Sequence, residues 1–275
     1  MNPRLLPFCV LLVTLSSCGG ASLSVSVPSA TEWYQPGPLS RWQWQLTGTI
    51  NTSYDVDLYD IDLFDTSKNT IRLLQQKQHK VICYFSAGSY ENWRPDANDF
   101  NIKVLGKALA GWEGERWLDI RADNVRNIML KRLDIAQEKG CDGVEPDNMD
   151  AYQNHSGFIL TPKDQLEYNR FIASEAHQRK LSVALKNDLD QVKSLVDDFD
   201  FAINEQCFEF NECDKLRPFI QHNKAVLNVE YKADYVSNPT ARKALCEDAR
   251  KREFSTLVMP LALDDSFRFS CLSNQ

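Results

Sequence analysis

Short apolar runs alternate with amphipathic stretches along most of the chain. The runs are rich in Val, Ile, Leu and Phe, as in buried strands, whereas the longer stretches carry apolar residues at helical spacing. We expect strands at residues 42–46, 56–64, 81–86, 116–120, 143–147, 182–186, 201–205, 225–230 and 256–261. We expect helices at residues 66–77, 123–138, 161–180, 215–223 and 239–251.

This alternation predicts the fold class. It is typical of α/β proteins with a parallel sheet. The candidate strands number nine, one more than a closed (β/α)8 TIM barrel uses. We therefore expect a single-domain barrel over residues 41–275, with one extra short strand at residues 42–46 or 116–120. A doubly wound open sheet is the alternative, and it is disfavoured because no glycine-rich phosphate loop follows a predicted strand.

The first residues of the chain have the pattern of an export signal. Arg4 precedes an apolar stretch that ends at Leu15 and is followed by small residues. That stretch is shorter than the roughly twenty residues that cross a membrane. We expect a signal peptide at residues 1–20 and a tether at residues 21–40, and hence an exported protein.

The end of this signal resembles a bacterial lipobox, in the sequence LSSC that finishes at Cys18. Lipidation of Cys18 would anchor the domain to a membrane and make the protein a cell-envelope lipoprotein. Ordinary cleavage near Ala21 is the alternative, and it would discard Cys18 and release a secreted protein.

Cysteine content and charge narrow the function further. Six cysteines lie beyond the signal, and in an oxidising compartment an even number indicates disulfides, for which we expect the bridges Cys207–Cys213 and Cys246–Cys271. No CxxC pair occurs and no His ends a predicted strand, so we expect neither a metal nor another cofactor.

The net charge of −7 disfavours a nucleic-acid partner, because phosphate binding needs a basic face. We expect a monomer.

Acidic and polar residues follow most of the predicted strands at their carboxyl ends. In a (β/α)8 barrel these ends meet on one face, where active sites lie. Each residue alone can be a loop acid or a helix cap, but a bowl of carboxylates suits glycoside hydrolysis, in which two carboxyl groups flank the scissile bond. The residues are Asp60, Asp62, Asp65, Tyr84, Ser86, Asp119, Glu145, Asp147, Lys186, Asn187, Asp188, Asn204, Glu205, Glu230, Asp264 and Asp265.

One segment in this set resembles a known family. Residues 140–150, GCDGVEPDNMD, are similar to the G-x-D-G-V-x-x-D-N-x-D signature of glycoside hydrolase family 114, the endo-α-1,4-polygalactosaminidases. Further segments match that family in order: WQWQL at 42–46, YDID at 59–62, CYFSAG at 83–88, KN at 186–187 and NEQC at 204–207. The resemblance covers residues 42–260. It implies a barrel that hydrolyses α-1,4-linked galactosamine in galactosaminogalactan-like polysaccharide.

The family's catalytic pair maps onto Asp147 and Glu205. We expect Asp147 to be the nucleophile of a retaining mechanism, held ionised by the amide of Asn148, which is also a candidate substrate-binding residue. We expect Glu205 to be the acid/base, because it ends an apolar strand where partial burial favours a protonated acid. Glu145 is a competing candidate, since strand alternation places it on the same face as Asp147.

The remaining candidates are assigned as substrate-binding residues. Asp62 and Glu230 can bind the ammonium group of galactosamine, and Asn187 can bond sugar hydroxyls. Tyr84 either stacks on a sugar face or packs in the core at the rim. Lys186 would repel an amino sugar, so we expect it to pair with a catalytic acid.

Two other functions remain open. The chain can be a barrel glycosidase of different amino-sugar or exopolysaccharide specificity, or a barrel that binds polysaccharide without cleaving it. The long segment at residues 88–115, with Tyr90, Trp93 and Trp112, is suited to a binding loop over a polysaccharide cleft.

Overall fold

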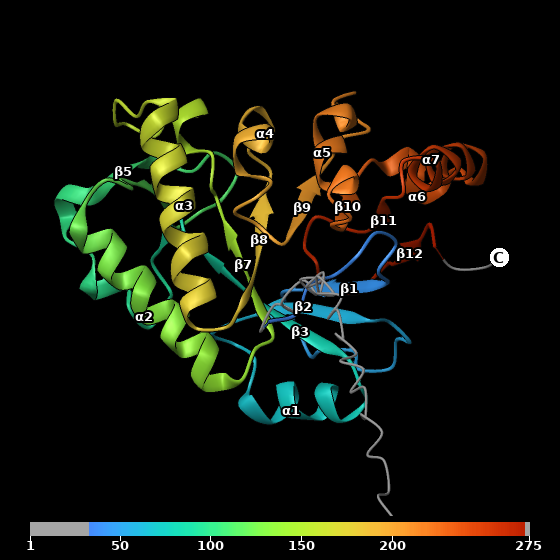
Figure 1. Cartoon of the computed structure of the whole chain (residues 1–275), viewed down its shortest axis with the longest axis horizontal. Helices are drawn as coiled ribbons and strands as arrows, with labels where there is room; N and C mark the ends of the chain where they lie inside the picture. Colours follow the sequence, from blue (N-terminus) through green and yellow to red (C-terminus); the bar gives the residue numbers. More distant parts are fainter. Residues whose placement is uncertain (1–32, 273–275) are drawn as a thin grey trace, which may run out of the picture. The chain divides into compact units, whose positions relative to one another are not determined.

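The computed structural model describes residues 33–272, so the expected signal peptide, with Cys18, and residues 21–32 of the expected tether lie outside the described residues. Eight parallel strands follow one another in chain order within a single sheet, and a short antiparallel strand follows the last of them (Figure 1). The strands are β1 (Trp42–Gln45), β2 (Leu58–Asp62), β3 (Lys80–Ser86), β7 (Gly143–Asp147), β8 (Ser182–Lys186), β9 (Phe201–Glu205), β10 (Val226–Glu230), β11 (Ser255–Val258) and the antiparallel β12 (Phe269–Ser270).

Two hydrogen bonds link the first and last parallel strands, one between the strands themselves and one between residues that follow them. Trp42 Nε1 donates to the carbonyl oxygen of Ser255 at 2.8 Å. The N–H of Leu46 donates to the carbonyl oxygen of Leu263 at 3.0 Å. The expected (β/α)8 barrel is confirmed.

Helices connect successive strands and lie outside them (Figure 1). They are α1 (Lys68–Gln76), α2 (Asp123–Lys139), α3 (Pro162–Gln178), α4 (Val192–Leu195), α5 (Arg217–Gln221), α6 (Ala233–Ser237) and α7 (Pro239–Lys251). Two predicted helix ends are found: Thr161 forms a capping box with Asp164 at the start of α3, and Gly140 ends α2 at a φ of 84°. The loop from 46 to 57 carries no helix, so one unit of the ideal barrel is incomplete.

The ninth predicted strand, at residues 116–120, belongs to a separate sheet. There β6 (Glu115–Leu118) pairs antiparallel with β4 (Ser89–Glu91) and β5 (Leu105–Ala108). This three-stranded sheet is inserted between β3 and α2, and it replaces much of the long loop expected at residues 88–115. The extra strand is therefore the one at 116–120, whereas 42–46 contains β1 of the barrel.

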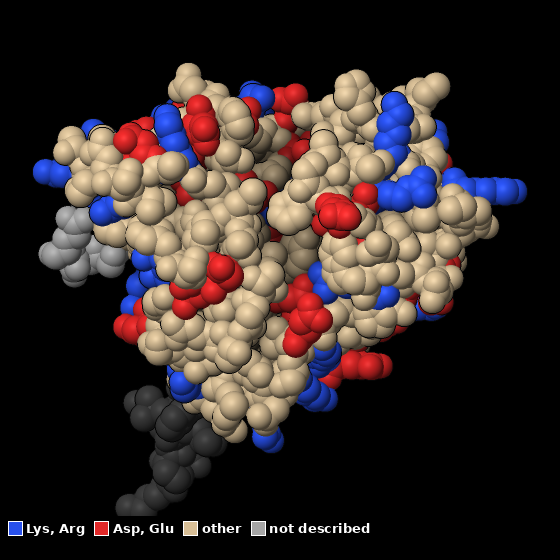
Figure 2. Space-filling model, turned by 180° about the vertical axis from the view of Figure 1, so that it is seen from behind, with Lys and Arg blue, Asp and Glu red and all other residues tan. Residues whose placement is uncertain are grey.

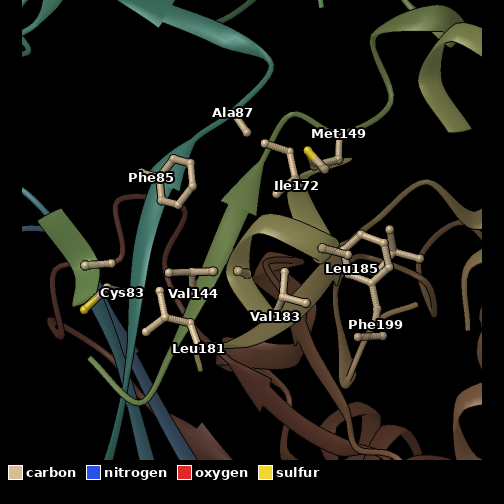
Figure 3. Packing of buried hydrophobic residues seen from close by; sticks show 14 of the residues in the cluster. Cys83, Phe85, Ala87, Val144, Met149, Ile172, Leu181, Val183, Leu185 and Phe199 are labelled. Atoms are coloured by element: carbon tan, nitrogen blue, oxygen red, sulfur yellow. The ribbon is translucent and has the colours of Figure 1, made fainter. Parts of the chain in front are cut away.

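Alternate residues along each barrel strand pack in two different layers. Ile82, Ala184 and Ile203 point into the barrel, where they join a cluster that includes Trp42 and Trp44. Their strand neighbours pack outward against the helices, as Figure 3 shows for Phe85, Val144, Val183, Leu185 and for Ile172 of α3. This period of two is what a strand covered on both faces requires.

Two glycines of the family-like motifs lie where a side chain would not fit. A Cβ at Gly88 would lie 1.8 Å from the carbonyl oxygen of Asn148. At Gly143 it would lie 2.8 Å from side-chain atoms of Ile82 and Ser182. Both glycines therefore allow neighbouring strands and loops to approach closely around β7.

The segment before β1 contacts the barrel. Trp33 Nε1 and Gln35 Nε2 both donate to Oδ1 of Asp200, at 2.9 and 2.8 Å. The Trp33 ring stacks on His177 with 4.2 Å between ring centroids. Residues 33–40, expected in the tether, therefore pack against the barrel. Among the helices of residues 33–272, none is long and apolar enough to cross a membrane.

Three disulfides link the described cysteines. The two expected bridges, Cys207–Cys213 and Cys246–Cys271, are present. A third bridge, Cys83–Cys141, ties β3 to the residue that precedes β7 by two positions. Three disulfides fit a protein that folds in an oxidising compartment.

Removal of the Cys83–Cys141 bridge is expected to destabilise the protein more than removal of the Cys207–Cys213 bridge. Their loops span 58 and 6 residues, and chain entropy assigns them about 4 and about 2 kcal/mol of stability. Denaturant unfolding of the paired Cys→Ala variants measures both losses. An equal loss, or a larger one at Cys207–Cys213, would contradict this expectation.

Candidate active site

Five neighbouring strands supply one row of polar side chains at the carboxyl end of the barrel. In the order β3, β7, β8, β9 and β10, these side chains are Tyr84, Asp147, Lys186, Glu205 and Tyr231, the last being the residue after its strand. The row is symmetric in chemistry. A lysine lies at its centre, a carboxylate on each side, and a tyrosine at each end.

Lys186 is the residue that joins the row. Its Nζ lies 3.0 Å from Asp147 Oδ1 and 3.4 Å from Glu205 Oε2. On the buried side of the row, Lys186 Nζ lies 3.0 Å from Glu145 Oε1. The Lys186 side chain is 2% exposed, and its ammonium lies 4.8 Å from the ring centroid of Trp44. A buried ammonium requires such partners, since burial without them would cost several kcal/mol.

Asp147 is surrounded by donors from three directions. Tyr84 OH donates to Oδ2 at 3.0 Å, whereas Oδ1 accepts from Lys186 and, at 2.7 Å, from the backbone N–H of Asn148. The expected bond from Asn148 therefore comes from its backbone. Its side-chain amide donates instead to Ser86 Oγ at 2.9 Å, which holds the residue against β3.

Glu205 has a matching set of donors. Tyr231 OH donates to Oε1 at 2.6 Å, and Asn187 Nδ2 approaches Oε2 at 3.4 Å beside the Lys186 ammonium. Asn187 Oδ1 also accepts from the backbone N–H of Glu205 at 3.0 Å. Asn187 therefore fixes both the backbone and the carboxylate of Glu205.

The chain turns in the same way after each of the three central residues. Asn148, Asn187 and Gln206 have φ values of 61°, 50° and 62°, in the left-handed region. Asn tolerates this conformation better than most residues, which explains Asn after Asp147 and after Lys186. The turn directs the chain away from the strand immediately, so the preceding side chain stays at the rim.

Exposure separates the two candidate catalytic carboxylates from Glu145. The side chains of Asp147 and Glu205 are 20% and 25% exposed, whereas that of Glu145 is fully buried. Figure 2 shows acidic side chains within a hollow of the face turned away in Figure 1. Of the three carboxylates bound to Lys186, only Asp147 and Glu205 are open to a substrate.

The pKa values of Lys186 and of the two tyrosines in the row are set by burial and by the charges of their neighbours. Burial alone would lower the pKa of Lys186, but the carboxylates of Asp147, Glu145 and Glu205 hold it well above its ordinary value. Burial, followed by the charge of Asp147, raises the pKa of Tyr84. Burial and the charge of Glu205 do the same to Tyr231. Both phenols therefore act as hydrogen-bond donors at neutral pH.

Two predicted binding residues lie in other surroundings. Asp62 is buried and binds Arg94 through both oxygens, at 2.7 and 3.0 Å. Glu230 is fully buried and accepts from the backbone N–H groups of Phe208 and Glu209, so it braces the loop after β9. The structure does not bring Asp62 or Glu230 into the row with Asp147.

Sequence reasoning missed Tyr231 and Asp150. Tyr231 follows the predicted strand at residues 225–230 directly, and its position at a strand end could have indicated it. Asp150, the last residue of the GCDGVEPDNMD segment, is partly buried, and burial together with the charge of Asp147 raises its pKa to about 6. Within residues 33–272, no group of three or more His, Cys, Asp or Glu side chains is arranged to hold a metal ion.

A (β/α)8 barrel with two partly exposed carboxylates at the carboxyl ends of its strands has the architecture of a glycosidase. The chain belongs to glycoside hydrolase family 114, because the profile described as "Glycoside-hydrolase family GH114" matches residues 24–275. The protein is therefore a glycoside hydrolase.

Solved structures agree with this assignment. The chain is similar to Aspergillus fumigatus Ega3 in complex with galactosamine, with 43% identity, a TM-score of 0.82, and coverage of 86% of this chain and 97% of that one. It also shares its fold with the glycoside hydrolase domain of PelA from Pseudomonas aeruginosa, with 15% identity, a TM-score of 0.65, and coverage of 85% and 99%. No curated protein sequence matches.

Folding stability is expected to fall as pH rises from about 5 to about 8. Burial is the largest cause that raises the pKa of Glu115 and Glu230 to about 7, and that of Asp188 to about 8. The folded protein keeps these protons where the unfolded chain has already lost them, so each ionisation on the alkaline side opposes folding. Thermal unfolding across this range measures the effect.

A matched pair of variants tests the cause of that slope. Glu115→Gln removes one buried acid and keeps an acceptor for the 2.7 Å bond from Ser89, so it should lessen the fall in melting temperature. Glu113→Gln changes an exposed acid two residues away and should leave the slope as it is. A melting temperature that rises over this range would contradict the account.

Proposed function

We propose that this protein is an exported glycoside hydrolase that cleaves α-1,4-galactosaminidic bonds in galactosaminogalactan-like polysaccharide. Membership of family 114 supports the reaction class. The galactosamine bound to the 43% identical Ega3 supports an amino-sugar substrate. The observation that carries the proposal is the row Asp147, Lys186 and Glu205, in which two partly exposed carboxylates share one buried ammonium.

In the proposed mechanism, Asp147 is the nucleophile and Glu205 the acid/base. Asp147 attacks the anomeric carbon while Glu205 gives its proton to the departing glycosidic oxygen, so one C–O bond forms as the other breaks. Glu205 then takes a proton from water, whose oxygen attacks the same carbon and releases Asp147. The closer Lys186 contact and the backbone donor from Asn148 favour the anionic role for Asp147.

The spacing of the two carboxylates supports a retaining mechanism. Asp147 Oδ1 and Glu205 Oε2 lie 3.0 and 3.4 Å from the same nitrogen, so they are at most about 6.4 Å apart. Retaining enzymes hold their carboxyl groups about 5–5.5 Å apart, whereas inverting enzymes leave about 6.5–9.5 Å for a water molecule. The shared ammonium draws the two carboxylates together and so favours the shorter separation of a retaining enzyme.

Export is proposed from two features. The first residues match a secretory signal that ends at Cys18, the candidate lipidation site. The three disulfides are of the kind that persist in an oxidising compartment. We propose either a lipoprotein of the cell envelope, from which residues 1–17 are removed and Cys18 is retained, or a secreted protein, from which residues 1–20 are removed.

Hydrolysis of a defined α-1,4-galactosamine oligomer, followed by proton NMR, is expected to give products that first appear as the α anomer. Asp147→Asn and Glu205→Gln should each lower turnover by about 10³-fold or more, because each removes one of the two reacting carboxyl groups. Glu209→Gln, at an exposed acid four residues after Glu205, is the matched control with ordinary turnover expected.

Three outcomes would count against parts of this proposal. Full activity of Glu205→Gln would remove that residue from the mechanism. A first product of β configuration would contradict retention. Cleavage of another amino-sugar polymer, but not of this oligomer, would contradict the substrate while leaving the glycosidase assignment intact.

A further inference from the structure

Asp60 is a buried carboxyl group that the proposed mechanism does not use. It lies on β2 at 0% exposure, and the strand register places it beside Trp44 of β1 and Ile82 of β3, both of which point into the barrel. Within the described chain, no N–H or O–H group donates a hydrogen bond to either of its oxygens. An isolated carboxylate in such a place would cost several kcal/mol.

Glu145 of β7 is the group that faces Asp60, and the two carboxyl groups lie within hydrogen-bonding reach of each other inside the barrel. It too is fully buried, and its only close cationic contact among the described residues is the Lys186 ammonium at 3.0 Å. No other donor reaches its oxygens in that part of the chain. Two buried carboxyl groups in contact form a stable arrangement when one of them carries a proton that it donates to the other.

We propose that Asp60 and Glu145 share a single proton and that this pair positions Lys186 between Asp147 and Glu205. Asp60 is then a neutral acid whose O–H donates to the carboxylate of Glu145. That carboxylate balances the Lys186 ammonium from below, while Asp147 and Glu205 bind it from the rim. This inference deepens the proposed function and rests on it for its effect on turnover.

The charges around Asp60 are consistent with this arrangement. The charged groups that face it are Glu145 and Asp147 from β7 and Lys186 from β8. Burial and the neighbouring Glu145 both raise the pKa of Asp60, and the Lys186 charge opposes them only in part. Burial also raises the pKa of Glu145, to about 7, so the pair binds a proton more tightly than a solvated carboxyl group.

The shared proton has a consequence for the pH dependence of catalysis. When the shared proton leaves, a second negative charge appears beneath Lys186 and draws its ammonium away from the rim. Asp147 and Glu205 then lose part of their common donor. The alkaline limb of kcat/KM should therefore follow the titration of Asp60.

Infrared spectroscopy of the protein without substrate tests the shared proton directly. In the difference between the spectra of the unaltered protein and of Asp60→Asn, a carboxylic C=O band should remain above pH ~8, where acids of ordinary pKa have ionised. Asp188, whose pKa is about 8, contributes equally to both spectra and cancels in that difference. Glu145→Gln should move the titration midpoint of the Asp60 band down by about one pH unit or more, because the repelling charge is gone.

The kinetic arm links this proton to Lys186. In Asp60→Asn, whose amide keeps a donor toward Glu145 but cannot ionise, the alkaline limb of kcat/KM should move up by about one pH unit or more. Asp200→Asn, which alters a buried acid bound to His177, should leave the limb in place.

Each arm has its own contradicting result. The absence of a band that depends on Asp60, or a midpoint unmoved by Glu145→Gln, overturns the shared proton whether or not the enzyme cleaves galactosamine. A band that behaves as expected beside an unmoved kinetic limb overturns the positioning role. If Asp60→Asn fails to fold, the Glu145→Gln spectrum alone still decides the first point.

Discussion

The site depends on a single buried ammonium. Lys186 reaches the rim from the middle strand of three, and carboxylates on both neighbouring strands bind it. A lysine this deep is stable only where anions surround it, and carboxylates this crowded are stable only around a cation. The buried ammonium and the surrounding carboxylates therefore stabilise each other. The spacing that results, with two partly exposed carboxylates on one nitrogen, supports the retaining mechanism proposed above.

The surrounding structure fixes this arrangement through hydrogen bonds. Tyr84 and Tyr231 close the row at its two ends, and Asn187 and Asn148 fix the backbone immediately after the central residues. Beneath the rim, Glu145 balances the inward side of the ammonium. The inserted sheet begins where Gly88 touches the backbone of Asn148, so the loops nearest the site are packed against the barrel. Little reorganisation is then required when charge develops during the reaction.

Much of this could be predicted from the sequence, because strand periodicity and helix caps are local signals. The bounds of β7, β8 and β9 were predicted to the residue, and Asp147, Lys186 and Glu205 follow from them. The partners of a side chain are not local. Nothing in the sequence indicates a partner for Asp62, yet Arg94, which lies in the inserted segment after β4, binds its carboxylate. Glu230 caps a loop backbone that no pattern indicates. Tyr231 was missed because it lies one residue beyond its strand.

The most direct test of the central role of Lys186 is the stability of Lys186→Met as a function of pH. We predict a loss of about 3–5 kcal/mol near pH 8, where its carboxylates are left without a counter-ion. The loss should be smaller near pH 5, because Glu145, no longer held ionised by the Lys186 charge, takes up a proton there. Lys224→Met is the matched control, since the hydrogen bonds of Lys224 within residues 33–272 go to the backbone carbonyls of Val196 and Phe199, which do not titrate, and its loss should vary little with pH. A Lys186→Met loss that is absent, or that does not change with pH, would contradict the account.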